Sequence, residues 1–246
     1  MSTSAAVNGP SDQLRVPSSY PDQIAQILQR EILEGRYRRG EHLQQDEICR
    51  RFGLSRTPAR EALRKLQALG LVELVPNRGA MVRLPTLREL QEVYQVRAEL
   101  EGLATELTVR NRTDDLMERL HAAQRQLTEV VATIQPGQLP EPDGSPASEQ
   151  LRQFNDLFHQ LIHAGSGNEK LSHMIQDLQR YFPKDAVRLA IESPTALRQL
   201  YLDEHVVILE EMAQGRPKTA RRAMQRHILQ SRTMLISFLR ERGFDG

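Results

Sequence analysis

The sequence predicts a mostly α-helical protein, with an N-terminal winged helix-turn-helix followed by a C-terminal all-helical bundle of about six helices. Two observations predict the first part: Gly53 separates two short helical segments, and two β-type runs joined by a turn follow them. The second part is predicted because apolar residues recur at helical spacing from residue 86 onward. The aromatic content of 4%, with no tryptophan, also suits helices better than a large sheet.

Composition excludes several classes of protein. The 246 residues are 39% hydrophobic and 26% charged, which is typical of a globular chain and not of a disordered one. No apolar run approaches the ~20 residues that span a bilayer, and the first residues lack the pattern of a secretory signal. The single cysteine, Cys49, excludes an intramolecular disulfide framework. We therefore expect a cytoplasmic protein that does not engage membranes.

The net charge of +1 hides an asymmetry along the chain. Residues 1–84 carry 13 basic and 9 acidic residues, whereas residues 85–246 carry 20 basic and 23 acidic residues. Within 36–65 alone there are nine basic and four acidic residues. Such a basic patch favours binding to nucleic acid, although a solvated basic face would look the same from charge alone.

We expect a mobile polar tail over 1–18 and a first domain over 19–84. Its helices are expected over 22–34, 45–52 and 56–69, and its two strands over 71–75 and 80–84. This is the layout of a winged helix-turn-helix, in which the second helix of the pair enters a major groove.

The third expected helix carries a basic stripe. Arg56, Arg60 and Arg64 are spaced four residues apart, opposite an apolar face of alanine and leucine. Arginine near the start of a recognition helix can pair with a guanine edge, and the hydroxyls of Ser55 and Thr57 suit phosphates. The stripe therefore predicts a DNA-reading helix.

The turn between the two expected strands adds a second candidate contact. Asn77 and Arg78 project from its tip, and Gly79 permits the turn, within reach of a DNA backbone or minor groove. The alternative for the preceding helix is a salt-bridged surface helix, because Glu61 lies four residues before Lys65. The hairpin favours DNA binding over that alternative.

One segment resembles a known family. The run GEHLQQDEICRRFGLSRTPAREALRKLQALGLVELVPNRGAMV (40–82) closely resembles the DNA-binding domain of GntR-family bacterial transcription regulators, most strongly in GLSRTPAREAL and GLVELVPNRG. The resemblance implies operator contacts by Arg56, Thr57 and Arg60, with support from Ser55, Arg78 and Gly79. At Asp46 the family often carries an arginine that touches DNA. A carboxylate repels phosphates, so that contact is not expected here and the operator preference should shift.

The second domain is expected over 85–246 and is assigned to effector binding and dimerisation. Thr86 and Glu89 form a capping box at its start. Four prolines and two glycines predict a flexible loop over 134–147. The expected helices cover 87–111, 113–133, 148–164, 169–190, 195–213 and 217–241.

Three of the seven histidines are placed toward a common interior. His159 and Asn155 lie beside a buried stripe of one helix, and His205 and His227 lie beside or within apolar stripes of two others. A buried imidazole needs a partner, and a divalent metal such as Zn or Ni would supply one. A water-filled polar pocket is the alternative.

Residues 87–236 resemble the FCD effector domain of the FadR-like branch of the same family. The resemblance is carried by RAELEGLAT (97–105), NDLFHQLIHAGSGNEKL (155–171), DEHVVILEEM (203–212) and ARRAMQRHI (220–228). Many such domains hold a metal through an Asp or Asn four residues before a His, and through two later His. The resemblance therefore implies Asn155, His159, His205 and His227 as metal ligands.

Two details qualify this implied site. Asn155 replaces the commoner aspartate, so it offers a carbonyl oxygen but no charge and weakens the expected affinity. His163 is a rival ligand that falls off the buried stripe. The resemblance also implies that Arg97, near Tyr94, meets an effector carboxylate, and the alternative is an i,i+4 ion pair with Glu101.

These features predict a ligand-responsive transcription regulator. A homodimer would bind a palindromic double-stranded DNA operator, and a small organic acid would change its affinity. The alternatives are a regulator for which the metal itself is the signal, one with a lipid-type effector and no metal, and a metal-dependent hydrolase fused to a DNA-binding head. No HExxH motif, nucleophile elbow or phosphate-binding loop supports the hydrolase.

Overall fold

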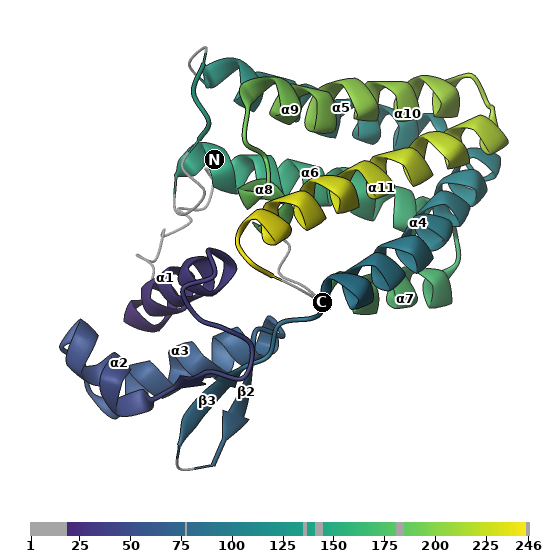
Figure 1. Ribbon diagram of the computed structural model, residues 1–246. Helices are drawn as coiled ribbons and strands as arrows, with labels where there is room; N and C mark the ends of the chain where they lie inside the picture. The colour runs from purple at the N-terminus through teal and green to yellow at the C-terminus, as the bar shows by residue number, and fades with distance from the viewer. Residues whose placement is uncertain (1–18, 77, 135–136, 141–144, 181–184, 245–246) are drawn as a thin grey trace, which may run out of the picture.

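The N-terminal part of the protein consists of three helices and a small sheet (Figure 1). The computed structural model describes residues 19–76, 78–134, 137–140, 145–180 and 185–244, so the expected tail over 1–18 and Asn77 lie outside the described residues. We call this part, from α1 to β3, the winged-helix unit. Its elements are α1 (Tyr20–Leu33), β1 (His42–Leu43), α2 (Gln45–Phe52), α3 (Arg56–Ala68), β2 (Val72–Val75) and β3 (Gly79–Val82).

Local chemistry sets where the helices of this unit begin and end. At the start of α1 the backbone N–H of Ser19 donates to the Asp22 carboxylate. Helix α2 ends at Gly53, whose φ of +65° is a left-handed conformation that glycine adopts without steric cost. The chain then turns into α3, whose apolar face is buried through Ala59, Ala62, Leu63 and Leu66.

The sheet has three antiparallel strands in the order β1-β3-β2, one strand more than the sequence predicted. Strand β1 is two residues long, too short to show an alternating pattern, and it pairs Leu43 with Ala80 of β3. At Gly79, where φ is +93°, a Cβ atom would lie 2.2 Å from the carbonyl oxygen of Leu43. Glycine at this position therefore lets β1 approach β3.

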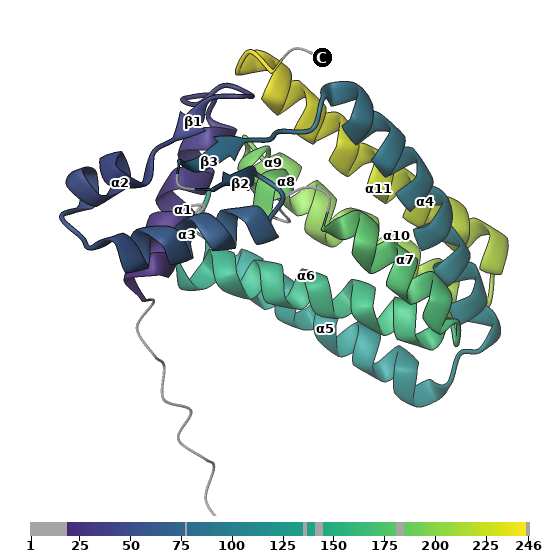
Figure 2. The same ribbon diagram turned by 90° about the horizontal axis from the view of Figure 1, so that it is seen from below.

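The remainder of the chain is an all-helical bundle, which confirms the predicted fold class. Helices α4 and α11 lie side by side, as do α5 and α6 (Figure 2). Six of its helices have ten or more residues in the described part of the chain. The elements are α4 (Leu87–Arg110), α5 (Asp114–Thr133), α6 (Pro146–Gly165), α7 (Glu169–Gln179), α8 (Asp185–Leu189), α9 (Pro194–Arg198), η1 (Gln199–Asp203), α10 (Glu204–Ala213) and α11 (Pro217–Glu241).

Two expected helices differ from the prediction. The helix expected over 169–190 is divided into α7 and α8, with 181–184 outside the described residues. The helix expected over 195–213 contains a π-helical turn, η1, between α9 and α10. Apolar periodicity does not reveal such a turn, because its five residues are too few to establish a spacing different from that of the flanking helices. The expected loop over 134–147 falls partly outside the described residues and ends where α6 begins at Pro146.

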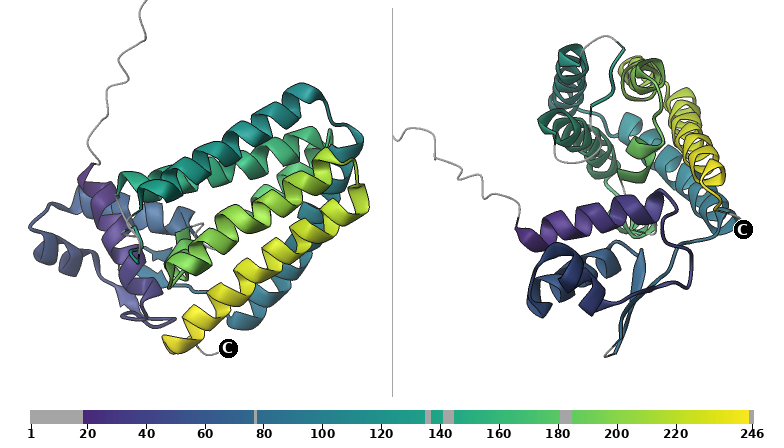
Figure 3. Two further views of the ribbon diagram at one scale, coloured as in Figure 1. Left: turned by 90° about the horizontal axis from the view of Figure 1, so that it is seen from above. Right: turned by 60° about the vertical axis from the view of Figure 1, so that its left-hand side comes forward.

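The winged-helix unit lies at one end of the bundle (Figure 3). Its apolar core continues into the bundle through Leu84 and Leu87, without a break between the two parts. The chain after α11 also reaches the unit: a Cβ atom on Gly35, where φ is +77°, would lie 2.7 Å from the carbonyl oxygen of Arg242. Phe244 and Tyr37 pack against the same core. In the described residues, no helix combines the length and apolarity needed to cross a membrane.

The close approach at Gly79 gives a stability prediction. Gly79→Ala introduces both a left-handed alanine and a clash with the Leu43 carbonyl, whereas Gly40→Ala has a similar φ of +83° but open space around the new Cβ atom. We expect Gly79→Ala to lower the free energy of unfolding by about 1–3 kcal/mol more than Gly40→Ala, measured by chemical denaturation. Equal losses in the two variants would show that the β1–β3 contact is not constrained by Gly79.

Candidate functional site

The first candidate surface is the exposed face of α3. Arg56, Arg60 and Arg64 are all exposed, on the side opposite the buried alanine and leucine face. Ser55 is the N-cap residue of α3, and its hydroxyl makes no capping bond to the helix. Thr57, in the first turn, is also exposed. The helix start therefore presents hydroxyl and guanidinium donors outward, as the sequence predicted.

Arg56 differs from the other two arginines because it is held by α2. Its Nε and Nη2 atoms donate to the two oxygens of Asp46 at 3.1 and 3.4 Å, and its backbone carbonyl accepts from Gln45 Nε2 at 2.6 Å. Both charged side chains remain largely exposed, at 77% for Arg56 and 65% for Asp46. This ion pair was not foreseen from the sequence, because the two residues belong to different helices.

The wing faces the same region. Arg78 is exposed, and it lines one hollow together with His42, Asp46, Arg56 and Gly79. The predicted contact Asn77 lies outside the described residues. Gly79 lies beside this hollow. It is also required for conformational reasons, because its backbone approaches the Leu43 carbonyl too closely for a side chain.

The second candidate site is a cluster of three histidines inside the bundle. His159 comes from α6, His205 from α10 and His227 from α11. All three are buried, at 5%, 0% and 4% exposure. Their ring centroids lie 5.5 Å apart for His159 and His205, 5.3 Å for His159 and His227, and 4.8 Å for His205 and His227. One ring nitrogen from each lies within 4.8 Å of the others, so the three can share one metal ion.

Outer partners fix the protonation of two of these rings. His227 Nδ1 lies 2.8 Å from Glu204 Oε2, and because a carboxylate only accepts, Nδ1 carries the proton. His205 Nδ1 lies 3.1 Å from Gln124 Oε1, and the amide of Gln124 is oriented because its Nε2 donates to the Tyr201 carbonyl at 3.1 Å. In the neutral form of either ring the lone pair is therefore on Nε2, as it is in histidines that bind metals through that atom.

The π-helical turn contributes to this arrangement. Tyr201 lies in η1, and its carbonyl orients Gln124 of α5, which in turn orients His205 at the start of α10. Phe158 of α6 stacks on the other side of His205, with ring centroids 4.0 Å apart. The ring of His205 is thus held at its edge by Gln124 and on its face by Phe158 before any ligand is considered.

Two buried nitrogens in the cluster lack hydrogen-bond partners among the described residues, His159 Nδ1 and His205 Nε2. His159 Nδ1 lies 3.7 Å from Glu101 Oε2, which is beyond hydrogen-bond length. Burial lowers the pKa of His159 to about 4, although Glu101 acts in the opposite direction. Burial, with repulsion from His227 and His159, also holds the pKa of His205 well below its usual value. His159 and His205 are therefore neutral imidazoles, each with a lone pair to donate.

Glu101, which sequence reasoning treated only as a pairing partner, is the centre of a neighbouring network. It is fully buried and contacts His163 Nε2 at 2.6 Å, Arg97 Nε at 3.2 Å and Gln179 Nε2 at 3.3 Å. Burial alone would raise the pKa of this carboxyl group, but His163, His159 and Arg97 together hold it well below its usual range. Glu101 is therefore an anion inside the bundle.

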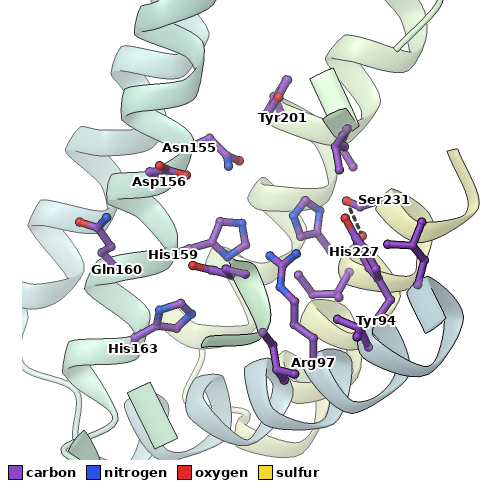
Figure 4. A pocket seen from close by; sticks show the side chains of 17 residues that line it. Tyr94, Arg97, Asn155, Asp156, His159, Gln160, His163, Tyr201, His227 and Ser231 are labelled. Carbon is purple, nitrogen blue, oxygen red and sulfur yellow. Dashed lines mark hydrogen bonds between the residues drawn. The ribbon is translucent and has the colours of Figure 1, made fainter. Parts of the chain in front are cut away.

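A cavity of about 90 Å³ joins the two groups of residues (Figure 4). Asn155, His159 and His163 follow one another along α6, and the Arg97 guanidinium extends from α4 toward His159 and His227 (Figure 4). Tyr94 lines the cavity beside Arg97, whose guanidinium carbon lies 5.4 Å from the Tyr94 ring centroid. The predicted effector residues and metal ligands therefore surround or adjoin one space.

The structure corrects one sequence argument and adds three residues to the site. His163 does not fall off the buried face: it is 4% exposed and lines the cavity. Glu101, Gln124 and Glu204 were missed as site residues. A signal existed for Glu101, which continues the buried stripe of Tyr94 and Ala98 along α4. The contacts of Gln124 and Glu204 with histidines depend on tertiary packing, for which the sequence carries no signal.

Family models and known proteins agree with this organisation. The model of the FCD domain matches residues 92–230, more than half of the chain, and that of the bacterial regulatory proteins of the gntR family matches residues 21–82. The chain belongs to the GntR family, FCD type. The family and its named relatives are transcription regulators and not enzymes, so this GntR-family chain is a transcription regulator and the hydrolase alternative is set aside.

Relatives extend over most of the chain. An uncharacterized HTH-type transcriptional regulator of Bacillus subtilis (strain 168), YdhC, is 28% identical over 217 residues, which are 88% of this chain and 89% of that protein. The HTH-type transcriptional repressor RspR of Escherichia coli (strain K12) is 24% identical over 216 residues, again 88% and 89% of the two chains. The solved structure of E. coli McbR/YncC has the same fold, with a TM-score of 0.59 at 23% identity over 90% of this chain and 99% of that one.

The lowered pKa values of His159 and His205 predict a loss of stability in acid. Below about pH 6.5 the unfolded chain takes up protons on these imidazoles while the folded chain does not, until the pKa of His159, about 4, is reached. We expect the free energy of unfolding of chelator-treated protein to fall by about 1.4 kcal/mol per pH unit for each such histidine, measured by urea unfolding.

A variant pair isolates the contribution of one ring. His159→Gln should make the pH dependence shallower by about 1.4 kcal/mol per unit between pH 6 and 4.5, while His121→Gln, on the exposed face of α5, should leave it unchanged. Retention of the full slope in His159→Gln would show that this ring is not held neutral by the fold.

Proposed function

We propose that this GntR-family regulator binds a palindromic operator as a homodimer and that a small organic acid, bound with a divalent metal in the histidine pocket, changes its affinity for DNA. Two-fold proteins match two-fold operators, because each winged-helix unit reads one half-site. Relatives named as repressors favour repression as the output. Such a regulator acts in the cytoplasm, where bacterial DNA lies.

The exposed guanidinium stripe of α3 supports DNA reading. Arg60 and Arg64 have no ion-pair partner among the described residues and remain exposed, so both can meet phosphates or base edges. Thr57 and Ser55, whose hydroxyl makes no capping hydrogen bond, lie at the start of α3, where backbone N–H groups favour a phosphate. Arg78 on the wing would add a contact outside the major groove.

The bare nitrogens of the buried histidines carry the metal proposal. His205 and His227 each have the outer nitrogen occupied by a fixed acceptor, so each presents Nε2 toward the interior. A buried lone pair without a partner is costly, and a divalent metal would satisfy several at once. His159, His205 and His227 would hold the ion, with the Asn155 amide as a further oxygen ligand lining the cavity. Neutral nitrogen donors of this kind favour Zn or Ni over Mg or Ca.

The size and charge of the cavity support a small acid as the effector. Its volume of about 90 Å³ is several times what one water molecule needs, and is well below the ~300–1,000 Å³ of pockets for drug-sized ligands. When bound, the metal would supply positive charge for a carboxylate, and Arg97 would add a guanidinium from α4. A long acyl chain does not fit such a volume.

One observation favours the alternative in which metal alone is the signal. Arg97 already donates to the buried Glu101 carboxylate, so part of its hydrogen-bonding capacity is used within the protein. An organic anion would then gain less from Arg97, and the metal would be the main source of positive charge in the pocket. The two alternatives make different predictions for the response to metal and to acids.

The DNA-reading helix is tested by removing one guanidinium. Arg60→Ala should weaken binding to a duplex selected from a random pool by about 1–3 kcal/mol, or roughly 5- to 150-fold, measured by fluorescence anisotropy. Arg222→Ala, which removes an exposed arginine from α11, is the matched control and should bind as the wild type does. Wild-type affinity in Arg60→Ala would refute a contact at this position.

The pocket is tested by thermal shift on chelator-treated protein. Zn²⁺ or Ni²⁺ at about 100 times its Kd should stabilise the folded chain by about 2.7 kcal/mol, raising Tm by roughly 5–10 °C. His205→Gln should abolish the shift and His121→Gln should retain it. A panel of small carboxylates should raise Tm further only with metal present. Release of the operator by metal alone, with no effect of any acid, would instead support the metal-sensing alternative.

A further inference from the structure

An acidic residue lies in the middle of the surface that reads DNA. Asp46, in the first turn of α2, contacts the guanidinium of Arg56, in the first turn of α3. The other two arginines of the stripe, Arg60 and Arg64, have no ion pair among the described residues. Arg56 is thus the one arginine of the stripe that is held by an ion pair within the described residues, and its partner lies on another helix, α2.

The contact uses one defined edge of the guanidinium. Asp46 accepts from Nε at 3.1 Å and from Nη2 at 3.4 Å, which is a side-on pairing of the planar group. Nη1 and the second hydrogen of Nη2 form the opposite, end-on edge, and that edge is the one that can pair with guanine O6 and N7. Asp46 therefore orients Arg56 without using the donors needed for a base.

The backbone of Arg56 is tied to the same helix. Gln45, the residue before Asp46, donates from Nε2 to the Arg56 carbonyl at 2.6 Å. Successive residues of α2 thus fix both the main chain and the side chain of Arg56. The carboxylate also faces the hollow shared with Arg78 of the wing, where it lowers the local positive charge.

Exposed ion pairs contribute little to stability, so the effect of this one should appear in the choice between DNA-binding modes. If Arg56 pairs with a phosphate, it must either break its ion pair with Asp46 or bring the Asp46 carboxylate close to the phosphate, which repels it. An Arg56 that pairs end-on with guanine keeps Asp46 as a partner. The carboxylate therefore penalises sequence-independent binding more than it penalises guanine reading.

We propose that Asp46 is a positioning residue that sets operator selectivity, by holding the side-on edge of Arg56 so that its end-on edge is left for guanine, and by opposing its capture by the phosphate backbone. The inference rests on the proposed DNA binding of α3. It assigns Asp46 a role in specificity although no contact of its own with DNA is required.

The test compares specific and non-specific binding in Asp46→Asn. An operator is first selected from random duplexes with the wild-type protein, and Kd is then measured for this duplex and for a scrambled one over a range of salt concentrations. Asp46→Asn should bind the scrambled duplex several-fold more tightly, with a salt slope steeper by about 0.9 for one added phosphate contact. Its discrimination against replacement of the guanine read by Arg56 should fall by roughly tenfold.

Glu47→Gln is the matched control. Glu47 is the next residue of α2, is also exposed, and has no ion pair among the described residues, so the variant changes the net charge equally without releasing Arg56. It should keep the wild-type discrimination. In an Arg56→Ala background, Asp46→Asn should no longer alter discrimination, because the residue that it orients is absent.

The outcomes distinguish a failure of the proposed DNA binding from a failure of the role proposed for Asp46. If the wild-type protein selects no sequence, the proposed DNA function itself fails. If it selects an operator but Asp46→Asn discriminates as well as the wild type, or if Glu47→Gln loses discrimination equally, the role of Asp46 is overturned. Circular dichroism and Tm of the variants confirm that each remains folded.

Discussion

The buried carboxylate of Glu101 is the constraint around which the centre of the bundle is built. A carboxylate with no exposure to water is tolerated only when charged and hydrogen-bonding partners surround it. Those partners are Arg97 of α4, His163 of α6 and Gln179 of α7, so the single charge draws three helices into fixed positions. Of the two histidines with a bare nitrogen, His159 of α6 lies next to Glu101, whereas His205 comes from α10. The polar groups around Glu101 thus have their hydrogen-bond partners within the protein, whereas the bare histidine nitrogens would need a ligand as their partner.

The winged-helix unit also contains a buried carboxylate that is paired with an arginine, in this case one that is partly exposed. Glu31 of α1 is 5% exposed and accepts two hydrogen bonds from the Arg51 guanidinium of α2, each 2.6 Å long. These bonds hold the pKa of the Glu31 carboxyl below its usual value, although its burial acts in the opposite direction. The pair fixes α2 against α1, and α2 in turn supplies Asp46 and Gln45 to Arg56. The position of Arg56 thus depends on a series of polar contacts that begins at the buried carboxylate of Glu31.

Much of this architecture could be predicted from periodicity and glycine positions, and the exceptions have physical causes. Helices with full turns of apolar spacing, such as α3 and α11, were predicted with bounds close to those observed, and Gly53 marked the turn correctly. Strand β1 has too few residues for a pattern, and η1 is a single π-helical turn of five residues, too short to show a spacing of its own. His159, His205 and His227 could be predicted to converge because each lies beside or within an apolar stripe of its helix. The roles of Gln124 and Glu204 depend on which helices become neighbours, and His163 was misjudged because α6 is covered on more than one side.

Helix α11 connects the two regions of the molecule in one piece of regular backbone. It carries His227 into the pocket, and its last turn leads directly to Arg242, whose carbonyl oxygen faces Gly35 of the winged-helix unit. From His227 to the end of the helix is about 21 Å at 1.5 Å per residue. A helix of this length behaves as a stiff lever arm, so a tilt of about 5° at the histidine displaces its far end by roughly 2 Å. Because only a glycine at position 35 leaves room for the Arg242 carbonyl, this close contact cannot absorb such a movement, which would pass to the winged-helix unit.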